Sequence, residues 1–161
     1  MIQKATLQDI NFFYELYMHP DINPYLLYEP MAIAAFNPIF ADLVQKELVF
    51  IYLNEEELPV GMFKLVPHTY RSAHIVYLGG VAVHPKYAGK GYGLLMMKAI
   101  LDYAKDRGFL RIELSVAIQN LKAIHLYKKV EFKKEGTLKK YTYLKEKDAF
   151  IDEILMAYLV K

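Results

Sequence analysis

Residues 81–100 read VAVHPKYAGKGYGLLMMKAI, and this stretch decides the fold. It predicts a strand that ends near Val83, a glycine-rich turn, and a helix over residues 93–107. The first N–H groups of a helix have no partner inside it, and the helix dipole adds positive charge there. The glycines at 89, 91 and 93 allow the backbone to approach an anion closely. The stretch therefore predicts an anion-binding turn at a helix N-terminus.

Two better-known phosphate-binding motifs do not fit this turn. The dinucleotide motif GxGxxG requires glycine at position 94, which is Leu94. A Walker A loop requires glycine at position 84 and Ser or Thr at position 91, which are His84 and Gly91. An ordinary tight turn between strand and helix is the alternative that these glycines alone leave open.

Outward from this turn, hydrophobic patterning predicts an alternation of strands and helices. Thr6 with Asp9 indicates a helix start, Gly108 a helix end, and Gly79-Gly80 a bulge inside a strand. Strands are expected over 2–5, 48–53, 60–66, 74–83, 110–116, 132–134 and 150–159, and helices over 7–18, 32–46 (with a break at 37–38), 93–107 and 120–129. The order β-α-α-β-β-β-α-β-α-β-β predicts one α/β (α+β) domain over residues 1–161 with a mixed sheet.

Composition excludes several classes of protein. The chain has 161 residues, 55% of them hydrophobic, which suits a single domain with a full core. It contains no cysteine, and its five histidines lack a metal-ligand spacing, so we expect no disulfide, thiol nucleophile or metal site. The net charge of +2 does not indicate nucleic-acid binding. No stretch has the pattern of a membrane span or a secretory signal, so we expect a soluble cytoplasmic protein.

A second informative stretch, residues 114–132, reads LSVAIQNLKAIHLYKKVEF. Together with Ala88-Gly89-Lys90-Gly91-Tyr92-Gly93, it resembles the GNAT superfamily of N-acetyltransferases. The phosphate loop of that family reads Arg/Gln-x-x-Gly-x-Gly/Ala. Its later signature matches Asn120, Ala123-Ile124, Leu126-Tyr127 and Glu131-Phe132. The resemblance spans about residues 75–160, and the ending over residues 132–136 and 150–156 looks like the branch that acetylates ribosomal-protein N-termini and amino sugars.

The resemblance implies a mostly antiparallel sheet of about seven strands flanked by about four helices. It also implies acetyl-CoA as cosubstrate and an amine as acceptor, bound to a monomer or a homodimer. Tyr127 would act as general acid near the sulfur, and Asn120 would hydrogen-bond the cofactor arm. Backbone groups of the strand would pair with the pantetheine arm, and those of the turn would hold the pyrophosphate. These backbone sites are Val81, Ala82, Val83, Ala88, Gly89, Lys90, Gly91, Tyr92, Gly93 and Leu94.

Three positions depart from the family pattern. Ala88 replaces the Arg or Gln of the phosphate loop, which implies weaker cofactor binding, and Glu131 replaces a helix-terminating glycine. Ser115 stands where the ribosomal-protein branch has a glutamate that resembles a general base. Glu113 lies on the same strand face as Ser115, so it is a candidate base acting through water, or else a salt-bridged strand residue. His74 and Asp152 are two further candidates for the general base. The alternative is that both are ordinary polar residues at strand ends.

The sequence leaves the acceptor open among peptide N-termini, amino sugars, polyamines and antibiotics. Tyr25, Tyr28 and Glu29 lie in a loop that either lines the acceptor pocket or simply packs. Two other functions remain: an acetyl-CoA-binding module without catalysis, and an RNA- or ribosome-associated module. The second would use the lysine-rich C-terminal third, although its lysines alternate with acidic residues as on a solvated face.

Overall fold

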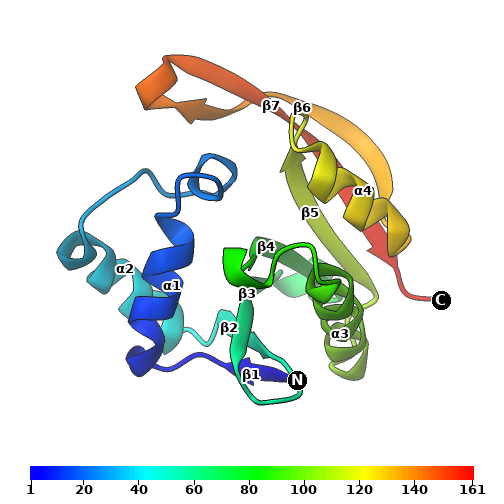
Figure 1. Ribbon diagram of the computed structural model, residues 1–161. Helices are drawn as coiled ribbons and strands as arrows, with labels where there is room; N and C mark the ends of the chain where they lie inside the picture. The colour runs from blue at the N-terminus through cyan, green and yellow to red at the C-terminus, as the bar shows by residue number, and fades with distance from the viewer.

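The computed structural model describes residues 1–161. Its seven strands form one sheet in the order β1-β2-β3-β4-β5-β7-β6 (Figure 1). Every neighbouring pair is antiparallel except β4 with β5. The strands are β1 Ile2–Lys4, β2 Val49–Leu53, β3 Pro59–Pro67, β4 Ile75–Val83, β5 Arg111–Ala117, β6 Lys133–Leu144 and β7 Ala149–Leu159, and the helices are α1 Ile10–Tyr17, α2 Ile33–Gln45, α3 Tyr92–Asp106 and α4 Leu121–Lys129. The predicted mixed, mostly antiparallel α/β fold is confirmed.

Helices cover both faces of the sheet, α1 and α2 on one face and α3 and α4 on the other (Figure 1). All five residues of β2 are buried, as its continuous apolar run predicts. Successive side chains of a strand point to opposite faces. Phe50 and Tyr52 therefore join the core with α3 and α4, while Val49, Ile51 and Leu53 join the core with α1 and α2.

The glycine pair in β4 forms the predicted bulge. The register between β3 and β4 shifts between Met62 and Lys64, opposite this pair. Gly80 has φ +57°, and a Cβ there would lie 2.7 Å from the hydroxyl oxygen of buried Tyr17. Only glycine fits both that conformation and that space.

Strands β4 and β5 are hydrogen-bonded over a short distance and then separate. Their pairing covers only residues 75–77 of β4 and 111–113 of β5. Beyond Tyr77, the edge of β4 that faces β5 has no strand partner. The sheet is therefore open between its two parts at the carboxyl ends of these strands (Figure 1).

Two predicted elements differ from the structure. Strand β6 has 12 residues, whereas the sequence predicts a strand only over residues 132–134. The prediction is too short because β6 is an outer strand with solvated lysines, so its sequence lacks the alternation of apolar and polar residues. Helix α2 continues through Pro38 without the expected break. Proline removes one helical hydrogen bond, but Phe36, Phe40 and Leu43 bury the helix against the sheet on both sides of it.

Local signals at helix ends are confirmed. The Thr6 backbone N–H donates to Asp9 Oδ2 at 2.7 Å, and a short 3₁₀ turn over residues 7–9 leads into α1. Gly108 follows α3 with φ +83°. None of the helices combines the length and apolarity needed to cross a membrane.

Candidate active site

A cavity of about 780 Å³ opens where β4 and β5 separate. Its walls come from the loop over residues 21–27, from β3, β4 and β5, from α4, and from β6 and β7. The predicted site residues that line it are Tyr25, Val81, Ala82, Val83, Asn120 and Tyr127. Tyr28, Glu29, Glu113, His74 and Asp152 are not among the lining residues.

The glycine-rich turn presents a row of free backbone donors. The N–H groups of residues 89–94 donate no hydrogen bond within the protein, whereas the N–H of Ala88 donates to Pro85 O at 3.1 Å. Gly91 is the N-cap of α3 with φ +83°, and Gly89 has φ +75°. A Cβ at either glycine would meet no atom within 4 Å, so the space in front of this turn is open. Six donors at a helix N-terminus can bind an anion, a role from which the Ala88 N–H is excluded.

His84 fixes the start of this turn. Its Nδ1 accepts a hydrogen bond from the N–H of Lys86 at 3.1 Å, and its Nε2 lies 2.9 Å from Glu15 Oε1 in α1. The ammonium groups of Lys86 and Lys90 lie 5.8 and 5.7 Å from the centroid of the Tyr87 ring. Two cations therefore flank the open donors and add to the positive potential there.

Asn120 and Tyr127 reach the cavity from α4. Asn120 is the N-cap of α4 and accepts a hydrogen bond from Ala123 N at 3.3 Å, which leaves its side-chain amide free to donate. Tyr127 is 7% exposed, and its hydroxyl makes no hydrogen bond with the protein. Burial, with a smaller contribution from Tyr77, raises the pKa of Tyr127 above its usual value. The phenol therefore keeps its proton beside the cavity.

The chain reversal after α4 holds the Tyr127 ring in place. The N–H groups of Glu131 and Phe132 donate to Lys128 O and Tyr127 O, both at 3.0 Å, in a Schellman motif. Glu131 has φ +71°, the left-handed conformation for which the family pattern has glycine. The Phe132 ring then packs against Tyr127 with centroids 5.9 Å apart.

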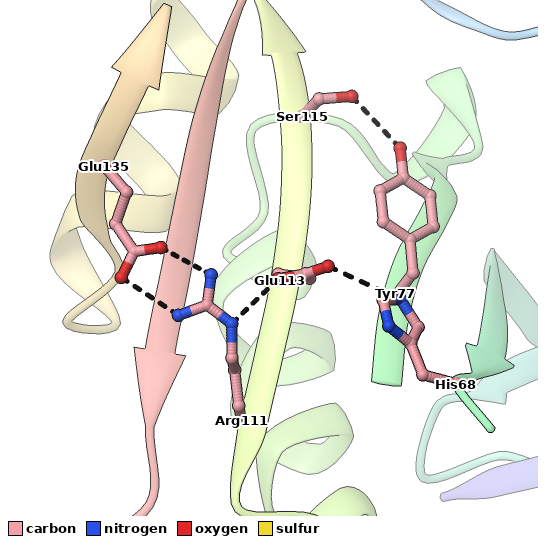
Figure 2. A network of polar contacts seen from close by, with 6 residues as sticks. All are labelled: His68, Tyr77, Arg111, Glu113, Ser115 and Glu135. Carbon is pink, nitrogen blue, oxygen red and sulfur yellow. Dashed lines mark hydrogen bonds and ion pairs between the residues drawn. The ribbon is translucent and has the colours of Figure 1, made fainter. Parts of the chain in front are cut away.

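Glu113 belongs to an ion-pair network outside the cavity (Figure 2). Arg111 Nε donates to Glu113 Oε2 at 2.8 Å, and His68 Nε2 lies 3.4 Å from Glu113 Oε1. The Arg111 guanidinium also binds both carboxylate oxygens of Glu135. Of the two alternatives for Glu113, this geometry corresponds to the salt-bridged strand residue.

A different carboxylate, Glu153 of β7, does line the cavity. Thr142 Oγ1 donates to Glu153 Oε2 at 3.0 Å, and Ser115 Oγ donates to Glu153 Oε1 at 3.5 Å. Tyr77 Oη lies 3.1 Å from Ser115 Oγ (Figure 2), so with Ser115 donating to Glu153, Tyr77 donates to Ser115. Burial raises the pKa of Glu153, and the two hydroxyl hydrogen bonds oppose that rise.

Glu153 was not predicted from the sequence, whereas its neighbour Asp152 was a candidate base. Adjacent strand residues point to opposite faces, and Asp152 instead binds Lys139 Nζ at 3.1 Å and Lys140 N at 2.8 Å. Glu153 is paired with Ala117 of β5, at the end of the strand that carries Ser115. The available signal was a charged residue inside the apolar run FIDEILMA. Whether that side chain faces the cavity, however, depends on the register of β7 with β5.

The loop before α2 divides between cavity and core. Tyr25 lines the cavity. Tyr28 packs against Tyr17 with ring centroids 5.3 Å apart. Buried Asn23 holds the loop by donating to Tyr17 O at 2.8 Å and to Tyr28 O at 2.9 Å. Only the first of the three predicted acceptor-loop residues therefore faces the cavity.

Residues 10–132 match the acetyltransferase (GNAT) family, and the chain belongs to that family. The chain is 31% identical over 113 residues to an N-alpha-acetyltransferase of Saccharolobus solfataricus, covering 70% of this chain and 65% of that protein. It is 27% identical over 138 residues to a spermidine N(1)-acetyltransferase of Vibrio cholerae, covering 81% and 76% of the two chains. The resemblance inferred from the two motifs is thereby confirmed, and it places the chain in a class of enzymes.

Solved structures confirm the fold. A spermidine N-acetyltransferase from Vibrio cholerae, in complex with CoA and spermine, superposes with a TM-score of 0.86 at 21% identity, covering 99% of this chain and 94% of that chain. A ribosomal-protein-alanine N-acetyltransferase from Brucella melitensis superposes with a TM-score of 0.80 at 18% identity, covering 99% of both chains. These TM-scores show that the three chains share one fold.

Proposed function

We propose that the chain is an N-acetyltransferase that moves the acetyl group of acetyl-CoA to a primary amine by direct attack in a ternary complex. The observation that carries this proposal is the row of six free N–H donors over residues 89–94, next to a cavity where β4 and β5 separate. Membership of the acetyltransferase family supports the same reaction.

The chain has suitable groups for the pyrophosphate and for the pantetheine arm of acetyl-CoA. The donors of residues 89–94 bind the pyrophosphate, since they are unpaired and nothing obstructs the space before them. Backbone groups of Val81 and Val83 take the pantetheine arm along the unpaired edge of β4, and Ala82 contributes to the cavity wall. The free amide of Asn120 donates to the same arm from the other side. Acetyl-CoA supplies the reactive thioester.

During transfer, the amine nitrogen bonds to the acetyl carbon and the carbon–sulfur bond breaks. The proton that the amine loses passes to Glu153, the carboxylate on the cavity wall, rather than to Glu113, which Arg111 neutralises. Tyr127 gives its phenolic proton to the leaving thiolate. Burial raises the pKa of Glu153, which makes it a stronger base, and the Tyr127 phenol carries its proton when the thiolate leaves.

Tyr127→Phe tests this assignment, since it removes one hydroxyl that makes no hydrogen bond in the protein. We expect turnover to fall by about 10²–10⁴-fold, as for loss of a general acid, with little change in the KM for acetyl-CoA. Steady-state kinetics with an amine panel, following release of CoA, measures both quantities.

Tyr158→Phe is the matched control. Tyr158 is also buried and packs against Phe132 with centroids 6.0 Å apart, but it does not line the cavity. Its loss should leave turnover within a few-fold of the parent. Unchanged turnover in Tyr127→Phe would remove Tyr127 from the mechanism. Acetyl-CoA binding without transfer to any amine would instead favour the non-catalytic binding module.

A further inference from the structure

Lys64 is a partly buried cation without a partner on the cavity wall. It lies on β3 and forms no ion pair and no side-chain hydrogen bond. Its stem lies over the glycine pair of β4: a Cβ on Gly79 would be 3.6 Å from Lys64 Cε, and one on Gly80 would be 3.8 Å from Lys64 Cβ. The missing side chains of these glycines make room for the lysine.

Burying a charge without a partner is costly, and burial lowers the pKa of Lys64. An anion bound beside the ammonium group would reverse this cost through a charge-assisted hydrogen bond. A second cation would increase it. The cavity wall at Lys64 therefore favours a ligand that places a negatively charged group there.

Lys64 and Glu153 both line the cavity. A Cβ on Gly79 would lie 3.6 Å from Lys64 Cε and 3.0 Å from Tyr77 Cε1, so the lysine stem and the Tyr77 ring both lie over Gly79. The Tyr77 hydroxyl is hydrogen-bonded to Ser115, and Ser115 donates to Glu153. The cavity wall therefore holds one cationic side chain, on β3, and one anionic side chain, on β7.

We propose that the acceptor is an amino-acid-like molecule, whose carboxylate binds Lys64 while its amine is directed to Glu153. This inference rests on the proposed function and adds the class of substrate. A polyamine carries only positive charges, so Lys64 would repel it. A molecule with a carboxylate and an amine complements both Lys64 and Glu153.

The test compares acceptors that differ only in the carboxylate. The parent protein and acetyl-CoA are assayed with the primary-amine amino acids, with their decarboxylated counterparts (for example lysine and 1,5-diaminopentane), and with spermidine. For the pair with the fastest transfer, we expect kcat/KM to be about 10- to 100-fold higher for the carboxylated member, the range for one charged hydrogen bond. A better decarboxylated amine, a preference for spermidine, or no transfer to any amino acid overturns the proposal.

Lys64→Met separates the charge from the stem, because Met keeps an unbranched chain over the two glycines. It should lose the preference within the pair, mainly through a higher KM for the carboxylated amine. Lys122→Met is the matched control, since Lys122 is the other cavity lysine, exposed on α4, and should keep the preference. An unchanged preference in a folded Lys64→Met protein would overturn the assignment of Lys64.

The proposed function can fail separately from this inference. If acetyl-CoA produces no rise in melting temperature and no amine is acetylated, the proposed function itself is wrong. If acetyl groups are transferred but the carboxylate gives no advantage, only the substrate class is wrong. The comparison of acceptor pairs uses the parent protein, so it stands even if a variant fails to fold.

Discussion

At the scale of single residues, Glu131 holds a backbone conformation that disfavours its own side chain. Its φ of +71° is left-handed, and a non-glycine residue there costs about 1 kcal/mol. The conformation is required by the Schellman motif that brings Phe132 back onto Tyr127. The strain at Glu131 therefore supports the position of the proposed general acid.

Glu131→Gly should be neutral or stabilising by up to about 1 kcal/mol, because relief of strain exceeds the entropy that glycine loses on folding. The ion pair of Glu131 with Lys161, at 3.6 Å, is exposed and contributes little. Chemical denaturation measures the change. Glu131→Ala is the control, since it loses the same ion pair but keeps the strain, and should be less stable than Glu131→Gly by up to about 1 kcal/mol. A loss above about 1 kcal/mol in Glu131→Gly would reveal a contact that these distances do not account for.

Glu153 carries a stability cost that depends on pH. Its pKa in the folded protein is raised above 4.5 by burial, so folding disfavours the ionised form. This cost is absent below the unfolded pKa and appears as the pH rises through the folded pKa. Glu153→Gln should therefore gain stability relative to the parent between pH 4 and pH 7.

Denaturation curves of Glu153→Gln and the parent at both pH values measure this gain. Glu113→Gln is the control of opposite sign, because it breaks the ion pair with Arg111 and should be less stable than the parent at pH 7. A difference between Glu153→Gln and the parent that stays constant with pH would contradict the assigned cause, which is desolvation of the carboxylate.

Residues differ in how far the sequence alone could place them. Asn120 and Tyr127 were predicted because they match one continuous family motif, in which all residues are close along the chain. Glu153 and Lys64 were missed because their positions depend on the pairing of distant strands. A shift of register by one residue would exchange Glu153 with Asp152 in the cavity wall.

At the scale of elements, predictability follows the strength of the hydrophobic pattern. Helix α3 and strand β2 have long apolar patterns, and the structure has them within about two residues of the expected bounds. Strand β6 has none, since its lysines face water and its pairing with β7 is interrupted by two register shifts. Backbone pairing with β7 makes it a strand, and such long-range pairing leaves no local sequence pattern.

The turn before α3 has a sequence signal that is local and belongs to the proposed cofactor site. Its glycines at 89 and 91 have positive φ, and their side-chain positions point into open space. The sequence could predict free donors here because a helix start always leaves them unpaired. It could not predict that Ala88 is excluded, since its N–H closes the preceding 3₁₀ turn through Pro85.

At the scale of the whole molecule, the sheet consists of two parts that share one short junction. Strands β1 to β4 form one part and β5, β7 and β6 the other, and only three residue pairs join them. By contrast, seven residue pairs join β5 to β7. A ligand seated in the opening contacts both parts, and because the opening exists only in the folded chain, such a ligand stabilises the fold.

Acetyl-CoA at about 100 times its dissociation constant should stabilise the protein by about 2.7 kcal/mol, a rise of roughly 5–10 °C in melting temperature. Gly91→Glu should abolish this rise, because it places bulk and negative charge before the six free donors. Gly108→Glu is the matched control: Gly108 has the same φ of +83° and the same open space, but lies beyond the other end of α3, so both variants bear similar strain. Thermal melts with and without acetyl-CoA measure all three proteins. If millimolar acetyl-CoA leaves the parent unshifted, or shifts Gly91→Glu as much as Gly108→Glu, then the turn before α3 does not hold the pyrophosphate.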